Sequence, residues 1–212
     1  MLTVHHLAVS QSDRIVWLCE ELGLAYDLKR YDRDPVTRAA PAEYKALHPS
    51  ETAPVISDGD VVLAESSAIA QYILTKYGRG ALVIASNERG YADYLYWLHV
   101  GQGSFVPAMM MDLVARMLNA TPPEGPRPRM SRSDIAFRNL EDRLGRVPYL
   151  AGEKFTAADI MSLFVMTTGR LYAPRDLGPY PNIRDYLQRI GNRPAFRRAM
   201  EKADPGLAIP LS

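Results

Sequence analysis

The clearest pattern in the chain lies at residues 53–69, which read APVISDGDVVLAESSAI. Two runs of strand-forming residues, 55–57 and 61–64, flank an Asp-Gly-Asp turn, and this arrangement predicts a β-hairpin. A helix from Glu65 to about Tyr77 is expected to follow. A helix N-terminus carries unpaired N–H groups and positive partial charge. The carboxylate and hydroxyl of Glu65-Ser66 therefore mark a candidate site for a small zwitterionic ligand.

Alternating strand and helix patterns precede this hairpin. Strands are predicted over residues 3–7 and 26–31, with a helix over 13–22 that ends before Gly23. A short irregular helix is expected over 41–47. The resulting order, β-α-β-α-β-β-α, predicts an α/β sheet domain over residues 1–78.

Strand patterns end after this region. Residues 79–86 break the periodicity and are predicted to form a linker, followed by an all-helical domain over residues 87–212. Four prolines between Asn119 and Met130 predict an exposed connection, because proline cannot continue a helix. Two glycines and a proline are expected to interrupt the first long helical region. The expected helices cover 91–98, 109–118, 131–144, 157–168, 183–190 and 195–202, with Gly101, Gly103 and Pro107 between the first two.

Composition limits the classes of function. The chain has 212 residues, of which 47% are apolar and 23% charged, and its formal net charge is +1. These values are those of an ordinary globular protein, and no long run of one charge predicts nucleic acid or a membrane surface as a partner. No stretch approaches the ~18 consecutive apolar residues of a membrane span, and the chain start does not resemble a leader. A cytoplasmic location is expected.

Cysteine and histidine usage restricts the chemistry further. Cys19 is the only cysteine, which excludes an internal disulfide and a zinc cluster built from cysteines. The four histidines show no metal-ligand spacing, so we expect no metal site. Any sulfur chemistry must use a sulfur supplied by a ligand.

Two serines stand where the first strand passes into the first helix. Ser10 and Ser12 lie in the segment from His6 to Arg14, and their simplest role is to cap the helix with Asp13. The alternative role is chemical. A hydroxyl that donates a hydrogen bond to a sulfur favours the thiolate, and the positive end of a helix adds to the effect.

Two further features lie at the same predicted end of the sheet. Pro54 begins a strand, either as an ordinary strand entry or as a residue that leaves the backbone near Val55 open to an extended ligand. Glu65-Ser66 is either a plain helix cap or a ligand anchor. The convergence of three such features on one edge favours a binding site.

Several motifs carry a family resemblance. Ser10, Ser12, Arg14, Trp17 and Glu20-Glu21-Leu22-Gly23, continued by Ala53-Pro54-Val55-Ile56 and Glu65-Ser66, resemble the serine-using bacterial and fungal glutathione transferases. Phe155-Thr156-Ala157-Ala158-Asp159-Ile160 resembles the buried capping box of that family. The resemblance covers nearly the whole chain. It implies a thioredoxin-like N-terminal domain, an all-helical C-terminal domain, a homodimer, and glutathione as co-substrate.

The resemblance also implies residue roles. Ser10 would hydrogen-bond the glutathione sulfur, with Ser12 as the fallback. The backbone of Val55 and the side chains of Glu65 and Ser66 would hold the peptide, while Thr156 and Asp159 would act in folding alone. Thr52 stands where such relatives usually carry lysine, and Glu51 precedes it, so weaker binding of the glycine carboxylate is expected. Gln102 is a second departure, at a position where glutamate is usual.

The helical domain offers a candidate pocket for the second substrate. Thioether and aromatic side chains adapt to varied apolar shapes, although such a stripe is more often simply core. The residues considered for this pocket are Tyr96, His99, Phe105, Met109 and Met110.

The expected reaction is conjugation of the glutathione thiolate to small, mainly apolar electrophiles. Glutathione-dependent peroxidase or reductase activity is a second possibility, although the missing cysteine at the first helix start argues against a mixed disulfide. A third possibility is a non-catalytic interaction protein on this fold.

Overall fold

The computed structural model describes residues 1–119 and 130–212. The chain forms two compact units, one of Met1–Ser86 with Ile190–Ile209 and the other of Asn87–Arg189 with Pro210–Ser212. The expected division placed all of 87–212 in the second domain and did not include the return of 190–209 to the first unit. Most of the proline-rich connection expected over 119–130 lies outside the described residues.

The first unit is built on a four-stranded sheet. Its strands are β1 (Leu2–Leu7), β2 (Asp27–Tyr31), β3 (Val55–Asp58) and β4 (Val61–Ala64), in the order β2-β1-β3-β4. β1 pairs parallel with β2, whereas β3 is antiparallel to both β1 and β4. The predicted hairpin is therefore present, and β1 and β3 are the inner strands.

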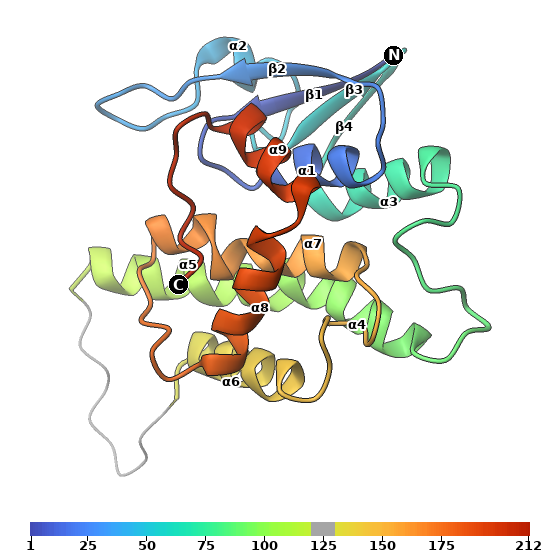
Figure 1. Cartoon of the computed structure of the whole chain (residues 1–212). Coiled ribbons are helices and arrows are strands. Elements are labelled where there is room, and N and C mark those ends of the chain that lie inside the picture. The colour runs from blue at the N-terminus through green and yellow to red at the C-terminus, as the bar shows by residue number, and fades with distance from the viewer. Residues whose placement is uncertain (120–129) are drawn as a thin grey trace. The chain divides into compact units, whose positions relative to one another are not determined.

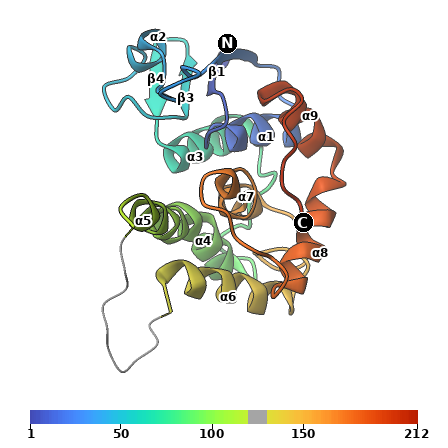
Figure 2. The same cartoon turned by 90° about the vertical axis from the view of Figure 1, so that its left-hand side faces the viewer.

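Helices cover both faces of this sheet. α1 (Asp13–Glu21) and α3 (Ser66–Tyr77) lie side by side on one face, and α2 (Ala42–Lys45) lies on the other (Figures 1 and 2). Under α2, Tyr44 packs in a core cluster with Tyr31 and Val55. This arrangement confirms the thioredoxin-like architecture expected for the first domain.

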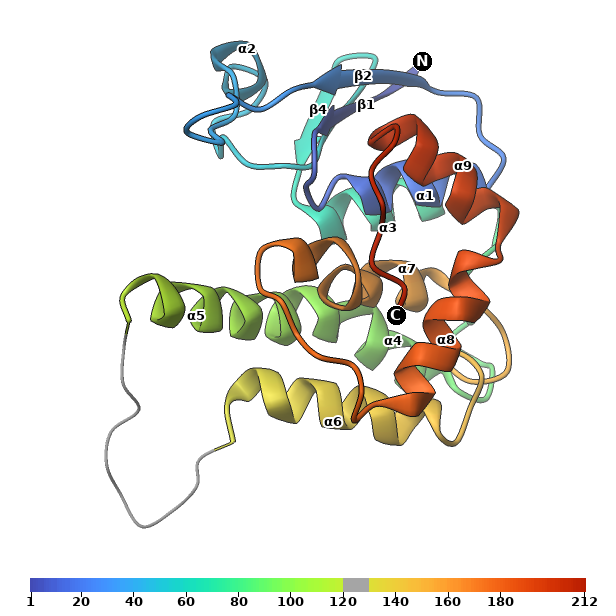
Figure 3. The ribbon, with the colours of Figure 1, turned by 60° about the vertical axis from the view of Figure 1, so that its left-hand side comes forward.

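The last helix packs against the first. α9 (Pro194–Ala203) lies along α1 (Figure 3), and the Phe196 ring meets the Trp17 ring edge-on with their centroids 5.0 Å apart. Arg193 pairs with Glu21 at 2.7 Å. Because α1 has the sheet on one side and α9 on another, most of its side chains are buried, its charged residues included.

The second unit begins with an uninterrupted helical run. α4 (Tyr91–Val100) continues through the π-helical turn η1 (Gly101–Phe105) into α5 (Val106–Met117) (Figure 3). The interruption expected at Gly101, Gly103 and Pro107 is therefore not a break in the helix. Pro107 stands in the first turn of α5, where a missing N–H costs little.

Close packing explains the first of these glycines. A Cβ on Gly101 would lie 2.7 Å from the carbonyl oxygen of Met161 and 2.8 Å from the Cα of Ser162. Both residues belong to α7 (Ala157–Leu163). Gly101 thus permits two helices to approach closely. This close approach cannot be predicted from the residues next to Gly101 in the sequence.

Further elements complete the helical part of the chain. They are α6 (Arg132–Leu144), the 3₁₀ turns η2 (Phe164–Met166) and η3 (Thr168–Leu171), and α8 (Pro181–Gly191). α7 ends at Leu163, short of the expected residue 168. In the described part of the chain, no helix combines the length and apolar character needed to cross a bilayer.

The capping box at the start of α7 is present. The Thr156 N–H donates to Asp159 Oδ2 at 2.9 Å, and the Thr156 hydroxyl accepts from the Ala158 N–H at 3.3 Å. Asp159 Oδ1 also accepts from the Leu150 N–H at 2.8 Å and the Tyr186 hydroxyl at 3.1 Å. Asp159 is fully buried and holds three segments of the helical unit together.

Candidate functional site

The loop between β1 and α1 holds the two candidate serines. The Ser10 hydroxyl donates to the Leu7 carbonyl at 2.7 Å and accepts from the Ser12 N–H at 3.2 Å. Ser10 retains 6% of its surface exposed, whereas Ser12 retains none. Of the two serines, Ser10 is therefore the more exposed.

Ser12 uses its hydroxyl inside the protein. It occupies the N-cap position of α1 without making a side-chain cap hydrogen bond. Its Oγ lies 2.7 Å from Ser10 Oγ and 2.8 Å from His6 Nδ1, and it accepts from the Leu7 N–H at 3.2 Å. The capping role considered for Ser12 is therefore not how this side chain is used.

A carboxylate from the other end of the chain completes this network. Asp204, which follows α9, places Oδ2 3.2 Å from His6 Nε2 and accepts from the Val9 N–H through Oδ1 at 3.0 Å. Burial raises the pKa of Asp204, but His6, the Val9 N–H and Arg30 lower it more, so that it lies below its ordinary value. Asp204 is therefore an anion at neutral pH.

Sequence reasoning did not single out His6 or Asp204 as site residues. The pair is separated by nearly the whole chain, and the local pattern around Asp204 is that of an ordinary helix end. No short-range signal marks such a contact, because it depends on the packing of α9 against α1.

Arg14 joins this loop to the start of α3. The side chain is fully buried, and its Nη2 donates to Ser66 Oγ at 3.1 Å and to the Gln11 side chain. Burial lowers the pKa of Arg14 to about 10, while Asp13 and Glu65 act to raise it. The group stays cationic at neutral pH, so a buried positive charge underlies the helix start.

Glu65 and Ser66 lie at this helix start as expected. Ser66 is buried, whereas Glu65 is exposed and has a φ of 74°. A non-glycine residue in this region carries backbone strain of order ~1 kcal/mol or more, which often accompanies a function. An exposed carboxylate next to helix N–H groups and a buried cation offers matched partners for an ammonium and a carboxylate.

The segment before β3 approaches the same sheet edge. Ala53 and Pro54 are joined by a cis peptide bond. Val55 is buried and stands in register with His5 of β1 and Ala64 of β4, so its main chain faces two strands. Thr52 is exposed, and its hydroxyl donates to Ser50 Oγ at 3.0 Å.

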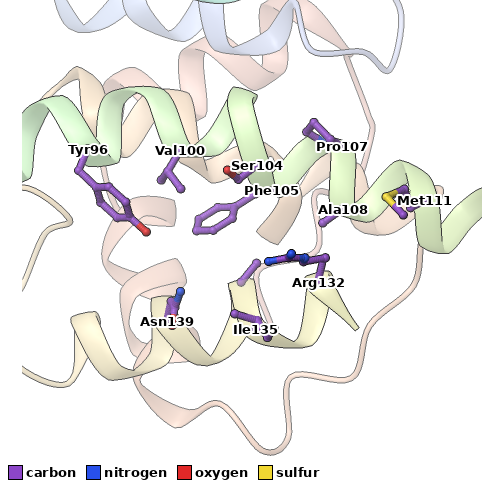
Figure 4. Close-up of a pocket in the computed structure, with 11 residues that line it drawn as sticks. Tyr96, Val100, Ser104, Phe105, Pro107, Ala108, Met111, Arg132, Ile135 and Asn139 are labelled. Carbon is purple, nitrogen blue, oxygen red and sulfur yellow. The ribbon is translucent and has the colours of Figure 1, made fainter. Parts of the chain in front are cut away.

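A cavity of about 350 Å³ lies within the helical unit. It is bordered by α4, η1, α5 and α6 (Figure 4). Tyr96 and Phe105 line it, as considered from the sequence, but His99, Met109 and Met110 do not. Met109 is buried in the core near Gly169, and Met110 is 44% exposed. The cavity lining further includes Val100, Ser104, Met111, Arg132, Ile135 and Asn139.

Comparisons with known proteins agree with this arrangement. Residues 10–76 match the family model of the glutathione S-transferase N-terminal domain, and residues 105–194 match that of the C-terminal domain. Glutathione S-transferase 3 of Schizosaccharomyces pombe is 32% identical, over 96% of this chain and 88% of the relative. Glutathione S-transferase 1 of Saccharomyces cerevisiae is 28% identical, over 96% and 95%.

Solved structures give the same result. A glutathione S-transferase from Actinobacillus pleuropneumoniae is 36% identical with a TM-score of 0.84, covering 97% of this chain and 95% of that one. A theta class enzyme from Xanthomonas axonopodis, solved with glutathione bound, shares the fold with a TM-score of 0.70 at 23% identity, covering 93% and 96%. The chain belongs to the glutathione S-transferase family.

Metal ligands do not gather at the site. Within residues 1–119 and 130–212, no three His, Cys, Asp or Glu side chains form a group suited to a metal ion. Cys19 is buried, and burial raises the pKa of its thiol to about 12. This thiol is therefore not a nucleophile at neutral pH.

Proposed function

We propose that the protein is a serine-using glutathione transferase, in which the Ser10 hydroxyl stabilises the thiolate of bound glutathione. The observation that carries this proposal is the position of Ser10. Ser10 lies in the loop that leads into α1 and is the more exposed of the two loop serines, and its hydroxyl is held by Leu7 and Ser12. A hydrogen bond from such a hydroxyl, together with the helix N-terminus, lowers the pKa of a thiol.

The rest of the peptide would be held at the neighbouring helix start. Glu65 would bind the γ-glutamyl ammonium, and Ser66 with the first N–H groups of α3 would bind its carboxylate. Arg14 adds positive charge beneath Ser66 through its 3.1 Å contact. The backbone from Thr52 to Val55 would contact the cysteinyl part and the glycine end. These assignments place every recognition group within the first unit.

The reaction would be conjugation. The bound thiolate attacks an electrophilic carbon, and the protein supplies orientation and charge stabilisation. The sulfur must come from glutathione, because the thiol of Cys19 is buried. Small, mainly apolar electrophiles are the proposed second substrates, for which Tyr96 and Phe105 provide apolar surface in the helical unit.

Replacing Ser10 tests the central assignment. Ser10→Ala is expected to raise the apparent pKa of bound glutathione, followed by thiolate ultraviolet absorbance, and to lower turnover at neutral pH roughly 10²-fold or more. Melting temperature should change little. The control is Ser86→Ala, at an exposed serine. Full activity of Ser10→Ala with an unshifted thiolate titration would overturn the assignment.

A non-catalytic interaction protein is the second candidate. Thr52, which offers no cation to the glycine carboxylate, is the observation that favours it. Retention on immobilised glutathione and turnover with electrophiles and a hydroperoxide separate the possibilities. Absence of both retention and turnover supports an interaction protein, and turnover of the hydroperoxide alone supports a peroxidase.

The proposal includes a cytoplasmic homodimer that works without a metal. Support for the dimer comes from apolar side chains of α5 that are half exposed or more in the single chain, namely Met111, Val114 and Met117. Light scattering measures the mass of the assembly, and metal analysis of active protein tests the last point.

A further inference from the structure

We propose that His6, held by Asp204, accepts the proton of the glutathione thiol through the hydroxyls of Ser12 and Ser10. This inference rests on the proposed role of Ser10. It adds a proton acceptor to that site and a role for the C-terminal segment, since Asp204 follows α9.

The atoms form a continuous chain inside the first unit. Ser10 Oγ lies 2.7 Å from Ser12 Oγ, and Ser12 Oγ lies 2.8 Å from His6 Nδ1. His6 Nε2 lies 3.2 Å from Asp204 Oδ2. His6 and Ser12 are fully buried, whereas Ser10 at the near end keeps a small exposed surface. The chain therefore leads from the surface to a buried imidazole.

The carboxylate decides the direction of the hydrogen bonds. An ionised Asp204 places a negative charge 3.2 Å from Nε2 of His6, a contact that lacks hydrogen-bond geometry. This charge favours the tautomer that carries its proton on Nε2 and leaves Nδ1 as an acceptor. Ser12 then donates to His6 Nδ1, and its oxygen can accept from Ser10. The Ser10 hydroxyl has two acceptors at 2.7 Å, Leu7 O and Ser12 Oγ, and rotation about one bond selects between them.

The proton transfer balances along this chain. The thiol S–H bond breaks, and its electron pair stays on sulfur. The thiol proton moves to Ser10 Oγ while the Ser10 proton moves to Ser12 Oγ and the Ser12 proton moves to His6 Nδ1. The result is a thiolate that accepts a hydrogen bond from Ser10 and an imidazolium paired with Asp204. After conjugation, the same hydroxyls return the proton to the leaving group or to water.

A buried imidazolium requires a compensating charge. Asp204 supplies it, and the Val9 N–H at 3.0 Å holds this carboxylate in place. The other charged residues lie on the strands beside β1 and on the two helices that pack together over the sheet. They are Asp27, Lys29 and Arg30 of β2, Asp58 of β3, Asp13, Arg14, Glu20 and Glu21 of α1, and Arg197, Arg198, Glu201 and Lys202 of α9. Arg30 is in register with His6, and its Nε donates to the Ala203 carbonyl at 2.7 Å.

The neighbouring histidine provides a matched control. His5 is also buried in β1, but its ring nitrogens contact the Tyr31 hydroxyl and Ser57 Oγ, each at 3.0 Å. Those contacts lead neither to a carboxylate nor to Ser10. A substitution at His5 disturbs the same strand without touching the relay.

Proton release on glutathione binding tests the relay. Calorimetry at neutral pH, in buffers of different ionisation enthalpy, counts released protons, and ultraviolet absorbance counts thiolate. Wild type is expected to form thiolate while releasing much less than one proton per thiolate. His6→Asn and Asp204→Asn should form roughly tenfold less thiolate at that pH. In these variants, each thiolate that forms should release one proton to the solvent. His5→Asn should behave as wild type.

The outcomes separate this inference from the proposed function. One proton released per thiolate by wild type overturns the relay and needs no folded variant. The relay is also overturned if His6→Asn forms as much thiolate and releases as many protons as wild type, because the network then only anchors the C-terminal segment. If wild type forms no thiolate, or Ser10→Ala forms as much as wild type, the proposed function itself fails.

Discussion

Single residues decide how well the glycine end of glutathione is held. Thr52 is exposed, and its hydroxyl donates to Ser50 within the same turn. Lys45 and Arg38 are exposed cations carried by neighbouring segments. A threonine at this position leaves the glycine carboxylate to solvent or to one of these cations.

Thr52→Lys is therefore expected to tighten glutathione binding. A charge-assisted contact contributes roughly 1.5–3 kcal/mol, which corresponds to about ten- to a hundredfold in affinity. The gain should be larger at low salt, because exposed charges are screened. Calorimetric titration of wild type and variant with glutathione and with its glycine-free analogue measures the effect. Equal affinities in all four pairings would show that position 52 does not face the ligand.

Whole elements explain which parts of the fold were predictable. The hairpin at 55–64 follows from a local turn signal and strand-forming residues, so it was predicted close to its observed limits. The continuous helical run from α4 to α5 was not predicted, because glycine has a low helix propensity and its presence in the sequence indicates a break. The packing of Gly101 against Met161 is a tertiary contact that outweighs this propensity.

The two glycines of η1 should respond oppositely to alanine. Gly101→Ala places a Cβ 2.7 Å from backbone and should destabilise the fold by roughly 1–3 kcal/mol. Gly103→Ala meets no atom within 4 Å and should be neutral or stabilising by up to ~1 kcal/mol. Denaturant unfolding measures both free energies. A stabilising Gly101→Ala would contradict the close approach of the helices.

Asp159 at the start of α7 should link stability to pH. Burial raises the pKa of this carboxyl to about 6, against an ordinary value near ~3.9. A raised native pKa means that the folded chain binds the proton of Asp159 more tightly than the unfolded chain does. The contribution of this protonation to the free energy of unfolding is therefore fully present below pH ~4 and is lost as the pH rises through about 6. The loss amounts to roughly 1.4 kcal/mol per pH unit within that window.

Comparison with Asp159→Asn isolates this titration. The variant cannot ionise at this position, so the free energy of unfolding of wild type relative to the variant should fall between pH ~4 and about 6. The slope is the test, since the variant also changes hydrogen bonds to Leu150, Thr156 and Tyr186. A difference that stays constant with pH would show that Asp159 is ionised throughout.

The whole molecule depends on the return of the chain to its first unit. The helix over 195–202 was predicted from its own pattern, and α9 occupies Pro194–Ala203. Its partner was not predictable, because no local signal says which surface a terminal helix will cover. The same contact brings Asp204 to Val9 and His6. The loop serines were predicted from their local sequence, whereas the Asp204 carboxylate was not, because its position depends on this packing.

Phe196→Ala is expected to weaken this return strongly. The ring is 3% exposed and packs edge-on against Trp17, and loss of a buried phenylalanine costs about 3–5 kcal/mol. Lys202→Ala on the same helix is the control. Its ion pair with Glu20 has a lysine that is 51% exposed, and such pairs contribute about 1 kcal/mol or less.

Denaturant unfolding followed by tryptophan fluorescence and by thiolate absorbance distinguishes local from global effects. If α9 holds Asp204 against the loop, Phe196→Ala should lower thiolate formation at denaturant concentrations where the helical unit is still folded. Lys202→Ala should follow wild type in both signals. Equal stability of the two variants would show that the Phe196–Trp17 contact does not secure α9, and that the ion pairs along α1 carry the attachment instead.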